Sequence, residues 1–509
     1  MSYLVGIDVG TTGAKVLLVG ADGGIVARST HEYPLLTPRP AWAEQNPADW
    51  WEATAAGIRQ VLKQSGIPPQ EIAGMGLSGQ MHGSVFLDER SEVIRPAILW
   101  CDQRTADQCR WITDRAGEKT VVEETLNPVL TGFTAPKIVW LRQNEPEAYA
   151  RVRKLLLPKD YIRFLLTGEF ATDVSDASGT SLLNIARRRW SPKMLAALDL
   201  SEAMLPTVHE SPAVTGGISP AAAEATGLAA GTPVVGGGGD QAAGAVGNGI
   251  VRPGVISVTT GTSGVVFAHM DEPRVDPRLR THTFCHAVPG KWHVMGAMLS
   301  AGGSLRWYRD ALAQAEVAEA KKRGVDPYEL LTAEAASAPP GCEGLIFLPY
   351  LTGERTPYPD PWARGVYFGL SLRHGRPHLV RAILEGVSYG LRDSLEILRG
   401  MGLPMSQVRA SGGGARSALW RQIQSDVFGA ELVTINVDEG PAFGAALLAG
   451  VGAGVYASVE EACDRTISVN QRTRPDPDTS ARYDAYYPIY QALYASLKDR
   501  FAEVGRLLQ

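Results

Sequence analysis

The chain has 509 residues, too many for one hydrophobic core, which indicates two large domains. Hydrophobic residues make up 45% of it, charged residues 20%, and the net charge is −5, so the composition argues against nucleic acid as a partner. We expect no signal peptide and no membrane span, since no run of about 18 apolar residues occurs. Five scattered cysteines without a Cys-x-x-Cys pair favour reduced thiols in a cytoplasmic protein, not a zinc site or disulfide framework.

The first predicted element is a β-hairpin that carries a phosphate-loop pattern. Strand-type runs at 3–7 and 15–19 flank the turn Gly10-Thr11-Thr12-Gly13. Such a turn frees backbone N–H groups and adds hydroxyls, which together form a concavity that binds anions. Asp8 precedes the turn, and an acidic residue beside phosphate donors usually indicates a metal ion.

The rest of the N-terminal region predicts alternating strands and helices. A third strand at 25–29 precedes a helix that Asn46 caps and Gly66 ends. Apolar strands at 72–77 and 97–100 follow. Three strands, a helix and then alternating elements are typical of a ribonuclease-H-like unit.

Two loops after these strands carry polar side chains. Met81 and His82 could line a polar pocket, although a single histidine is more often structural. Trp100, Asp102 and Arg104 are similarly ambiguous, with a salt bridge inside the loop as the simpler interpretation. The sequence alone does not decide whether these residues have a functional or a structural role.

A glycine-rich run at 234–245 places Asp240 where a strand ends and a helix of small residues begins. Ligands of α/β folds bind in the crevice outside strand ends. With no basic partner nearby in sequence, Asp240 could take a proton from a substrate hydroxyl. The alternative is that Asp240 only caps the following helix.

The second half repeats the opening pattern from about Gly254. Its hairpin carries the turn Gly261-Thr262-Ser263-Gly264, which matches the first turn but has Thr259 where the first has Asp8. Two such turns indicate a nucleotide held between two related domains; the alternative is two ordinary hairpins. Later, Gly412-Gly413-Gly414 joins a strand to a helix N-terminus, where free N–H groups suit a ribose or phosphate, although a structural turn is nearly as consistent.

Longer motifs resemble the FGGY family of carbohydrate kinases over nearly the whole chain. The runs 132–141 and 365–370 are similar to the two family signatures. Within the family, five runs resemble those of xylulokinases: 42–45, 80–83, 157–161, 284–287 and 348–351.

The resemblance implies an α/β fold of two ribonuclease-H-like, actin-like ATPase domains with a cleft between them. Residues 1–248 would hold the first hairpin, the sugar site and the catalytic aspartate, and residues 249–509 the second hairpin and the adenine-nucleotide site. It implies a cytoplasmic, homodimeric enzyme that uses ATP and Mg²⁺ to convert D-xylulose to D-xylulose 5-phosphate.

The resemblance also implies roles for single residues. Asp240 would be the base, and Asp8 a second catalytic residue that organises metal and phosphate. Met81, His82, Asp240 and Gln241 would bind the sugar. The nucleotide would be lined by Thr11, Thr12, Lys15, Gly261, Thr262, Gly302, Arg306, Gly413, Gly414 and Ser417.

Two alternatives remain at this stage. Gln241 stands where xylulokinases often have asparagine and glycerol kinases have glutamine, so glycerol, ribulose or another ketose or polyol stays open as acceptor. An actin- or chaperone-like ATPase switch would use the same fold, but no separate β-rich peptide-binding segment follows the second half.

Overall fold

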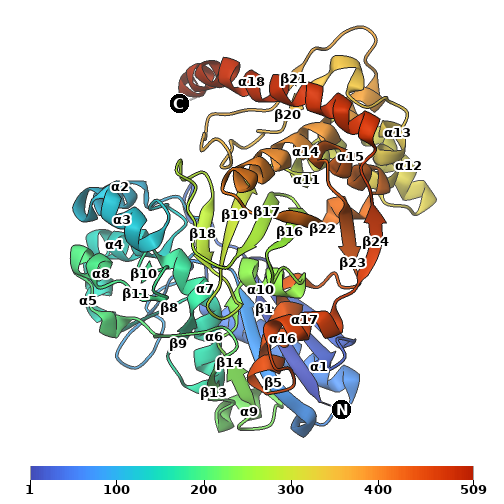
Figure 1. Cartoon of the computed structure of the whole chain (residues 1–509). Helices are drawn as coiled ribbons and strands as arrows, with labels where there is room; N and C mark the ends of the chain where they lie inside the picture. The colour runs from blue at the N-terminus through green and yellow to red at the C-terminus, as the bar shows by residue number, and fades with distance from the viewer. Residues whose placement is uncertain (1, 508–509) are drawn as a thin grey trace.

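Each half of the chain builds its own seven-stranded sheet (Figure 1). The computed structural model describes residues 2–507. The N-terminal sheet has the spatial order β13 (Val214–Gly217), β14 (Pro233–Val235), β5 (Ile72–Gly79), β1 (Tyr3–Val9), β2 (Gly13–Gly20) and β3 (Ile25–Glu32), and β15 (Gly238–Gly239) also pairs with β5. The C-terminal sheet has the order β18 (His282–Cys285), β19 (Trp292–Met298), β17 (Gly264–Met270), β16 (Gly254–Thr260), β22 (Met405–Ser411), β23 (Leu432–Ile435) and β24 (Val469–Thr473).

The two sheets repeat one scheme. In the first, β1 pairs antiparallel with β2 and parallel with β5. In the second, β16 pairs antiparallel with β17 and parallel with β22. The predicted repeat of a ribonuclease-H-like unit is therefore confirmed, and each phosphate-type turn lies at the end of the central hairpin of its sheet.

Helices cover both sheets and fill the periphery. Those of the N-terminal half are α1 (Pro47–Ser65), α2 (Ala106–Ala116), α3 (Glu118–Thr125), α4 (Thr134–Asn144), α5 (Pro146–Arg151), α6 (Pro158–Thr167), α7 (Val174–Ala177), α8 (Pro192–Leu198), α9 (Pro220–Thr226) and α10 (Asp240–Gly247). Those of the C-terminal half are α11 (Gly302–Leu312), α12 (Gln314–Arg323), α13 (Pro327–Ala335), α14 (Arg376–Gly400), α15 (Ala418–Phe428), α16 (Gly440–Gly452), α17 (Val459–Thr466) and α18 (Pro477–Leu507).

Short strand pairs brace the loops between these elements. They are β4 (Glu44–Gln45) with β7 (Ala97–Ile98), β6 (Val85–Leu87) with β8 (Lys154–Leu156), β9 (Ala171–Asp173) with β12 (Thr207–His209), β10 (Leu183–Asn184) with β11 (Arg189–Trp190), and β20 (Ile346–Leu348) with β21 (Val366–Phe368).

Helix α1 has the limits that its sequence predicts. The Asn46 side chain accepts a hydrogen bond from the Ala48 N–H, and Pro47 occupies the first helical position. Gly66 ends the helix in the left-handed region at φ 66°, where its N–H bonds to the Leu62 carbonyl.

The halves are joined by the crossing of α10 and α16, and α16 also packs on β1 and β5 of the N-terminal sheet. This approach needs glycine. A Cβ on Gly444 would lie 1.8 Å from the Ala243 carbonyl oxygen, and one on Gly6 would lie 1.9 Å from that of Ala442. Helix α16, which comes late in the sequence, thus covers the N-terminal sheet. A division of the chain near residue 248 assigns this helix to the other half.

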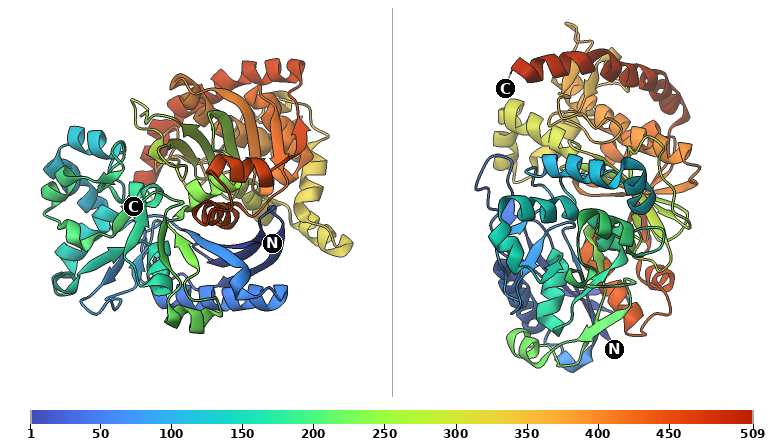
Figure 2. Two further views of the ribbon diagram at one scale, coloured as in Figure 1. Left: turned by 60° about the horizontal axis from the view of Figure 1, so that its bottom comes forward. Right: turned by 90° about the vertical axis from the view of Figure 1, so that its left-hand side faces the viewer.

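Farther from the junction, α18 packs against α14 and α15 and runs along the outer edge of the C-terminal half, whereas the N-terminus lies at the opposite end of the molecule (Figures 1 and 2). Within residues 2–507, none of the helices combines the length and apolar character that a membrane span requires.

Candidate functional site

A cavity of about 820 Å³ lies where the two halves meet. Its wall brings together five of the residues that the sequence singled out: Asp8, Lys15, Asp240, Gln241 and Gly413. They come from the β1–β2 hairpin, the start of α10 and the connection after β22, which are far apart in the sequence and meet only in the fold.

Asp8 lies at the end of β1, directly across the hairpin from Lys15 on β2. Burial raises the pKa of its carboxyl to about 6, against the lowering effects of Lys15 and Ser78. Its Oδ1 is buried and has no hydrogen-bond partner in the described part of the chain. A buried carboxylate oxygen without a protein donor suits a hard divalent cation, so the site fits the metal that the sequence implies.

Asp240 is the first residue of α10, and Gly239 occupies the N-cap position. The Asp240 side chain is therefore not needed as the cap of this helix. Burial and the nearby negative charge of Asp8 together raise the pKa of its carboxyl to about 7, against the lowering effect of hydrogen bonds from Gln241. Two carboxyl groups that both titrate far above the usual range face the same cavity, a pattern common in catalytic sites.

Two glutamines that sequence reasoning did not assign to the first phosphate-type turn fix its backbone by hydrogen bonds. Gln45 Nε2 donates to the Thr11 carbonyl at 2.7 Å. Gln80 Nε2 donates to Gln45 Oε1 at 2.8 Å and to the Gly10 carbonyl at 3.3 Å. The Thr11 hydroxyl accepts from the Trp100 indole at 3.0 Å, and neither Thr11 nor Thr12 lines the cavity.

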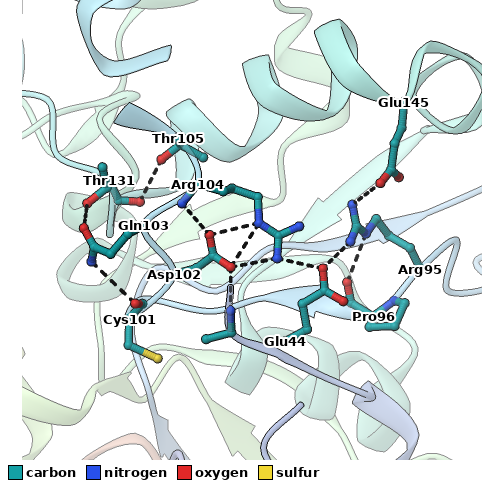
Figure 3. A network of polar contacts seen from close by, with 11 residues as sticks. Glu44, Arg95, Pro96, Cys101, Asp102, Gln103, Arg104, Thr105, Thr131 and Glu145 are labelled. Carbon is teal, nitrogen blue, oxygen red and sulfur yellow. Dashed lines mark hydrogen bonds and ion pairs between the residues drawn. The ribbon is translucent and has the colours of Figure 1, made fainter. Parts of the chain in front are cut away.

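A buried ion network fixes the segment that carries Gln45 (Figure 3). Arg104 lies 2.8 Å from Glu44 and 2.7 Å from Asp102. Asp102 Oδ2 also accepts the Ala43 N–H at 2.6 Å, and the guanidinium stacks 3.5 Å from the centre of the Trp42 ring. The salt-bridge interpretation of Asp102 and Arg104 is confirmed, and the pair positions the chain beside the turn.

Met81 lies close to Asp240, whereas His82 is placed by other contacts, and neither residue lines the cavity. A Cβ on Gly239 would be 2.8 Å from the Met81 side chain, so Met81 packs directly against the residue before Asp240. His82 Nδ1 donates to the Gly179 carbonyl at 2.9 Å, which assigns the proton to Nδ1 and leaves Nε2 as an acceptor. Burial and the charge of Lys137 hold the pKa of His82 well below its usual range, so the ring is neutral.

His82 is oriented through its backbone. Its φ of 70° lies in the left-handed region, which costs free energy for a non-glycine residue. Its carbonyl accepts hydrogen bonds from Lys137 Nζ at 2.8 Å and the Thr134 hydroxyl at 3.1 Å. Its ring packs against Phe133, 4.9 Å between centroids. Residues of the run 132–141 thus fix the position of His82 in the loop at 80–83.

The second turn docks on the start of α11. The N–H groups of Gly302 and Gly303 donate to the Gly261 and Thr262 carbonyls at 2.8 and 3.0 Å. These first amides of α11 are therefore already used within the protein. Arg306, farther along α11, is exposed.

The glycine run after β22 packs against the same turn. A Cβ on Gly414 would lie 2.6 Å from the Thr260 side chain, so Gly414 permits close packing. The Ser417 hydroxyl caps α15 by accepting from the Trp420 N–H at 3.3 Å. In this structure Gly413 lines the cavity, whereas Gly261, Thr262, Gly302, Arg306, Gly414 and Ser417 do not.

The cavity also contains polar residues to which sequence reasoning assigned no role. Glu439 precedes α16 and pairs with Lys15 at 2.9 Å and with Arg28 at 2.8 Å. Thr259 and Ser411 join their hydroxyls at 2.8 Å across β16 and β22. The one available signal was the position of Glu439 between a strand and a small-residue helix, which parallels that of Asp240.

Comparison with known proteins agrees with this architecture. Residues 3–247 match the N-terminal domain, and residues 256–453 the C-terminal domain, of the FGGY family of carbohydrate kinases. The chain is 42% identical to a xylulose kinase of Escherichia coli, over 97% of this chain and 99% of that one. It is 37% identical to a xylulose kinase of Bacillus subtilis, over 98% of both. A solved xylulose kinase structure from Rhodospirillum rubrum superposes with a TM-score of 0.91 at 31% identity, over 98% of this chain and all of that one. Together with the repeated sheets and the shared cavity, these matches show that the chain belongs to the FGGY family of carbohydrate kinases.

Proposed function

We propose that this protein transfers the γ-phosphoryl group of ATP to D-xylulose and forms D-xylulose 5-phosphate and ADP. The observation that carries the proposal is the pair Asp8 and Asp240, which face one cavity between the two halves. The relatives named xylulose kinase, matched over nearly their full length, support the acceptor. The family match also favours a kinase over an actin- or chaperone-like ATPase switch.

Asp240 is proposed as the general base. A base works best when its pKa is near the working pH, and the raised pKa of about 7 meets that condition. The ionised carboxylate would take the proton of the acceptor hydroxyl as that oxygen attacks the γ-phosphorus. Phosphoryl transfer otherwise depends mainly on positioning and on neutralising charge.

Asp8 is proposed to hold the metal ion, which we assign as Mg²⁺. Its buried Oδ1 has no protein partner among residues 2–507 and is available as a ligand. A bound divalent cation supplies charge neutralisation for the phosphate oxygens. Lys15, across the hairpin from Asp8, brings a second positive charge to the same side of the cavity.

Sugar binding is proposed for Met81, His82, Asp240 and Gln241. Neutral His82 offers Nε2 as an acceptor for a sugar hydroxyl, and Met81 supplies an apolar wall beside Asp240. The nucleotide is proposed to lie along Lys15 and Gly413. Thr11, Thr12, Gly261, Thr262, Gly302, Arg306, Gly414 and Ser417 remain predicted nucleotide contacts, which a closer approach of the two halves would have to bring into reach.

An ADP-release assay across a panel of acceptors tests the proposal. We expect the highest kcat/KM with D-xylulose, and glycerol and L-ribulose well behind. Gln241 keeps glycerol as the second candidate acceptor. A panel in which glycerol is the best acceptor would refute the xylulose assignment and leave the kinase assignment intact.

The cytoplasmic location and the homodimer stay predictions, and so does the division into domains at residues 248 and 249. Light scattering coupled to size-exclusion chromatography measures the molar mass directly. A mass near 54.5 kDa, that of a single chain, would contradict the dimer.

A further inference from the structure

We propose that a short buried segment, α7 with the 3₁₀ turn that follows it (residues 174–180), positions Asp240 and His82 relative to one another, and that Lys159 anchors it. The inference deepens the proposed function, since it rests on Asp240 as base and His82 as sugar contact. None of the residues in this segment lines the cavity. They act through the backbone of Gly239, which directly precedes Asp240, and through the ring of His82.

The segment holds the peptide next to Asp240 through Ser175. The Ser175 hydroxyl accepts a hydrogen bond from the Gly239 N–H at 3.1 Å. Gly239 is the N-cap of α10 and has no side chain of its own to satisfy the end of the helix. A Cβ on Gly238 would lie 3.2 Å from the Ser175 hydroxyl, so the backbone at Gly238 and the side chain of Ser175 are in close contact. The direction in which Asp240 leaves the strand is therefore set by Ser175.

The same segment holds His82 and the C-terminal half. The Gly179 carbonyl accepts the proton on His82 Nδ1, and a Cβ on Gly179 would lie only 2.0 Å from that nitrogen. One residue earlier, the Ser178 hydroxyl accepts the Cys285 N–H of β18 at 3.0 Å. Three successive contacts thus connect the proposed base, the proposed sugar contact and the other half of the molecule.

Lys159 fixes the start of the segment. Its Nζ lies 2.7 Å from Asp173 Oδ2, and both side chains are fully buried. The other oxygen, Asp173 Oδ1, accepts the Ser175 N–H at 2.8 Å and the Ser175 hydroxyl at 2.5 Å, which caps α7. A continuous path of one ion pair and two hydrogen bonds therefore runs from Lys159 through Asp173 and Ser175 to Gly239.

The cluster around Lys159 is acidic but is not a metal site. Asp160, Asp173 and Asp176 lie close enough together to share a cation, yet Lys159 Nζ already occupies their centre at 2.6, 2.7 and 3.2 Å. Arg163 also pairs with Asp160. Burial holds the pKa of Asp176 well above its usual range, which favours the neutral form of this side chain. The charge of Lys159 is thus matched within the protein.

Two buried serines provide a matched test. Ser175 and Ser211 both donate to Asp173 Oδ1, at 2.5 and 3.4 Å, and both are fully buried. Only Ser175 also accepts from Gly239. Ser175→Ala therefore cuts the path to Asp240, whereas Ser211→Ala removes a hydroxyl from the same carboxylate and leaves the path intact. Lys159 itself is a poor target, because its removal leaves the buried side chain of Asp173 without its cation.

We expect Ser175→Ala to lower kcat on the order of 10-fold to 100-fold, since small displacements of a catalytic group cost rates of this size. The ATP dissociation constant should stay within about twofold, and kcat should be normalised to the fraction of enzyme that binds ATP, so that loss of folded protein is not counted. Ser211→Ala should keep kcat within about twofold of wild type. Ser175→Cys, with a weak sulfur acceptor, should fall between wild type and Ser175→Ala.

Equal kcat values for Ser175→Ala and Ser211→Ala, whether both near wild type or both reduced, would overturn the inference. If Ser175→Ala does not fold, Ser175→Cys decides: a wild-type kcat overturns the inference, and a reduced kcat with unchanged ATP binding supports it. All variants are compared on the best acceptor of the wild-type enzyme. If D-xylulose is not the acceptor, the ADP-release panel with the wild-type enzyme shows it. If Asp240 is not the base, the kcat of Asp240→Asn shows it.

Discussion

Nζ of Lys137 lies 2.8 Å from the carbonyl oxygen of His82 and 2.7 Å from that of Gly132, and the side chain is completely buried. Burial lowers the pKa of Lys137 to about 7, and Asp102 and Cys101 partly oppose that shift. A buried amine, which donates hydrogen bonds in both its ionised and its neutral form, thus holds one backbone turn, the turn that presents the His82 ring to the proposed sugar site.

Replacing Lys137 should therefore affect the sugar more than the nucleotide. Loss of this donor leaves buried backbone carbonyls short of a partner, which costs about 1–3 kcal/mol, so we expect Lys137→Met to raise KM for D-xylulose by about tenfold. The ATP dissociation constant should stay near wild type. Steady-state kinetics with each substrate varied in turn gives both values, and an equal change in both would contradict the role in orienting His82.

Gly179→Ala offers a second test of the His82 orientation. The added methyl would lie 2.0 Å from His82 Nδ1, so the ring must move. We expect a rise in KM for D-xylulose with little change in ATP affinity. Gly400→Ala is the control, because a Cβ there meets no atom within 4 Å. A Gly179→Ala enzyme with a wild-type KM would show that the ring position does not matter for the sugar.

The rate should depend on pH through Asp240. The proposed base must be ionised, and its pKa is raised to about 7 by burial and by Asp8. As the pH falls below about 7, the ionised fraction in the free enzyme drops, so kcat/KM for the sugar should fall roughly tenfold per pH unit. Asp8→Asn removes the negative charge that raises this pKa, and the acid limb of any residual activity should move to lower pH. A limb that does not move would contradict the coupling of the two carboxyls.

Sugar and nucleotide binding should draw the two halves together. Eight of the predicted nucleotide residues lie outside the cavity wall, among them Thr11 on the first turn and Thr262 on the second. Closure would also exclude water from the phosphoryl group. Small-angle scattering should show a smaller radius of gyration with D-xylulose and a non-hydrolysable ATP analogue. An unchanged radius at saturation would count against closure.

Much of the architecture could be predicted because its signals are local. The limits of α1 follow from Asn46 and Gly66, which act within one turn of the helix. The repeated hairpins follow from two copies of one short pattern. Asp8 and Asp240 could be singled out because each stands at the end of an apolar strand beside glycines, and the fold brings them to one cavity.

The supporting residues could not be predicted, since their partners are distant in sequence. Gln45 meets the first turn across 34 residues, and Lys15 meets Glu439 across 424. Ser175 contacts Gly239 across 64. No local pattern encodes such pairs. The hydroxyl of Ser417, which the resemblance assigned to the nucleotide, instead caps α15 in this structure, a role that a serine at a helix start fills equally well.

The most direct test of the whole account is the kcat of Asp240→Asn, measured together with its ATP dissociation constant. Asparagine keeps the shape of the side chain but cannot accept the proton, and Gly239 already occupies the cap position of α10. We expect kcat with D-xylulose to fall about 10²–10⁴-fold, the usual contribution of a general base, while ATP binding changes little. Near-wild-type turnover of a folded, ATP-binding Asp240→Asn enzyme would remove Asp240 from the mechanism.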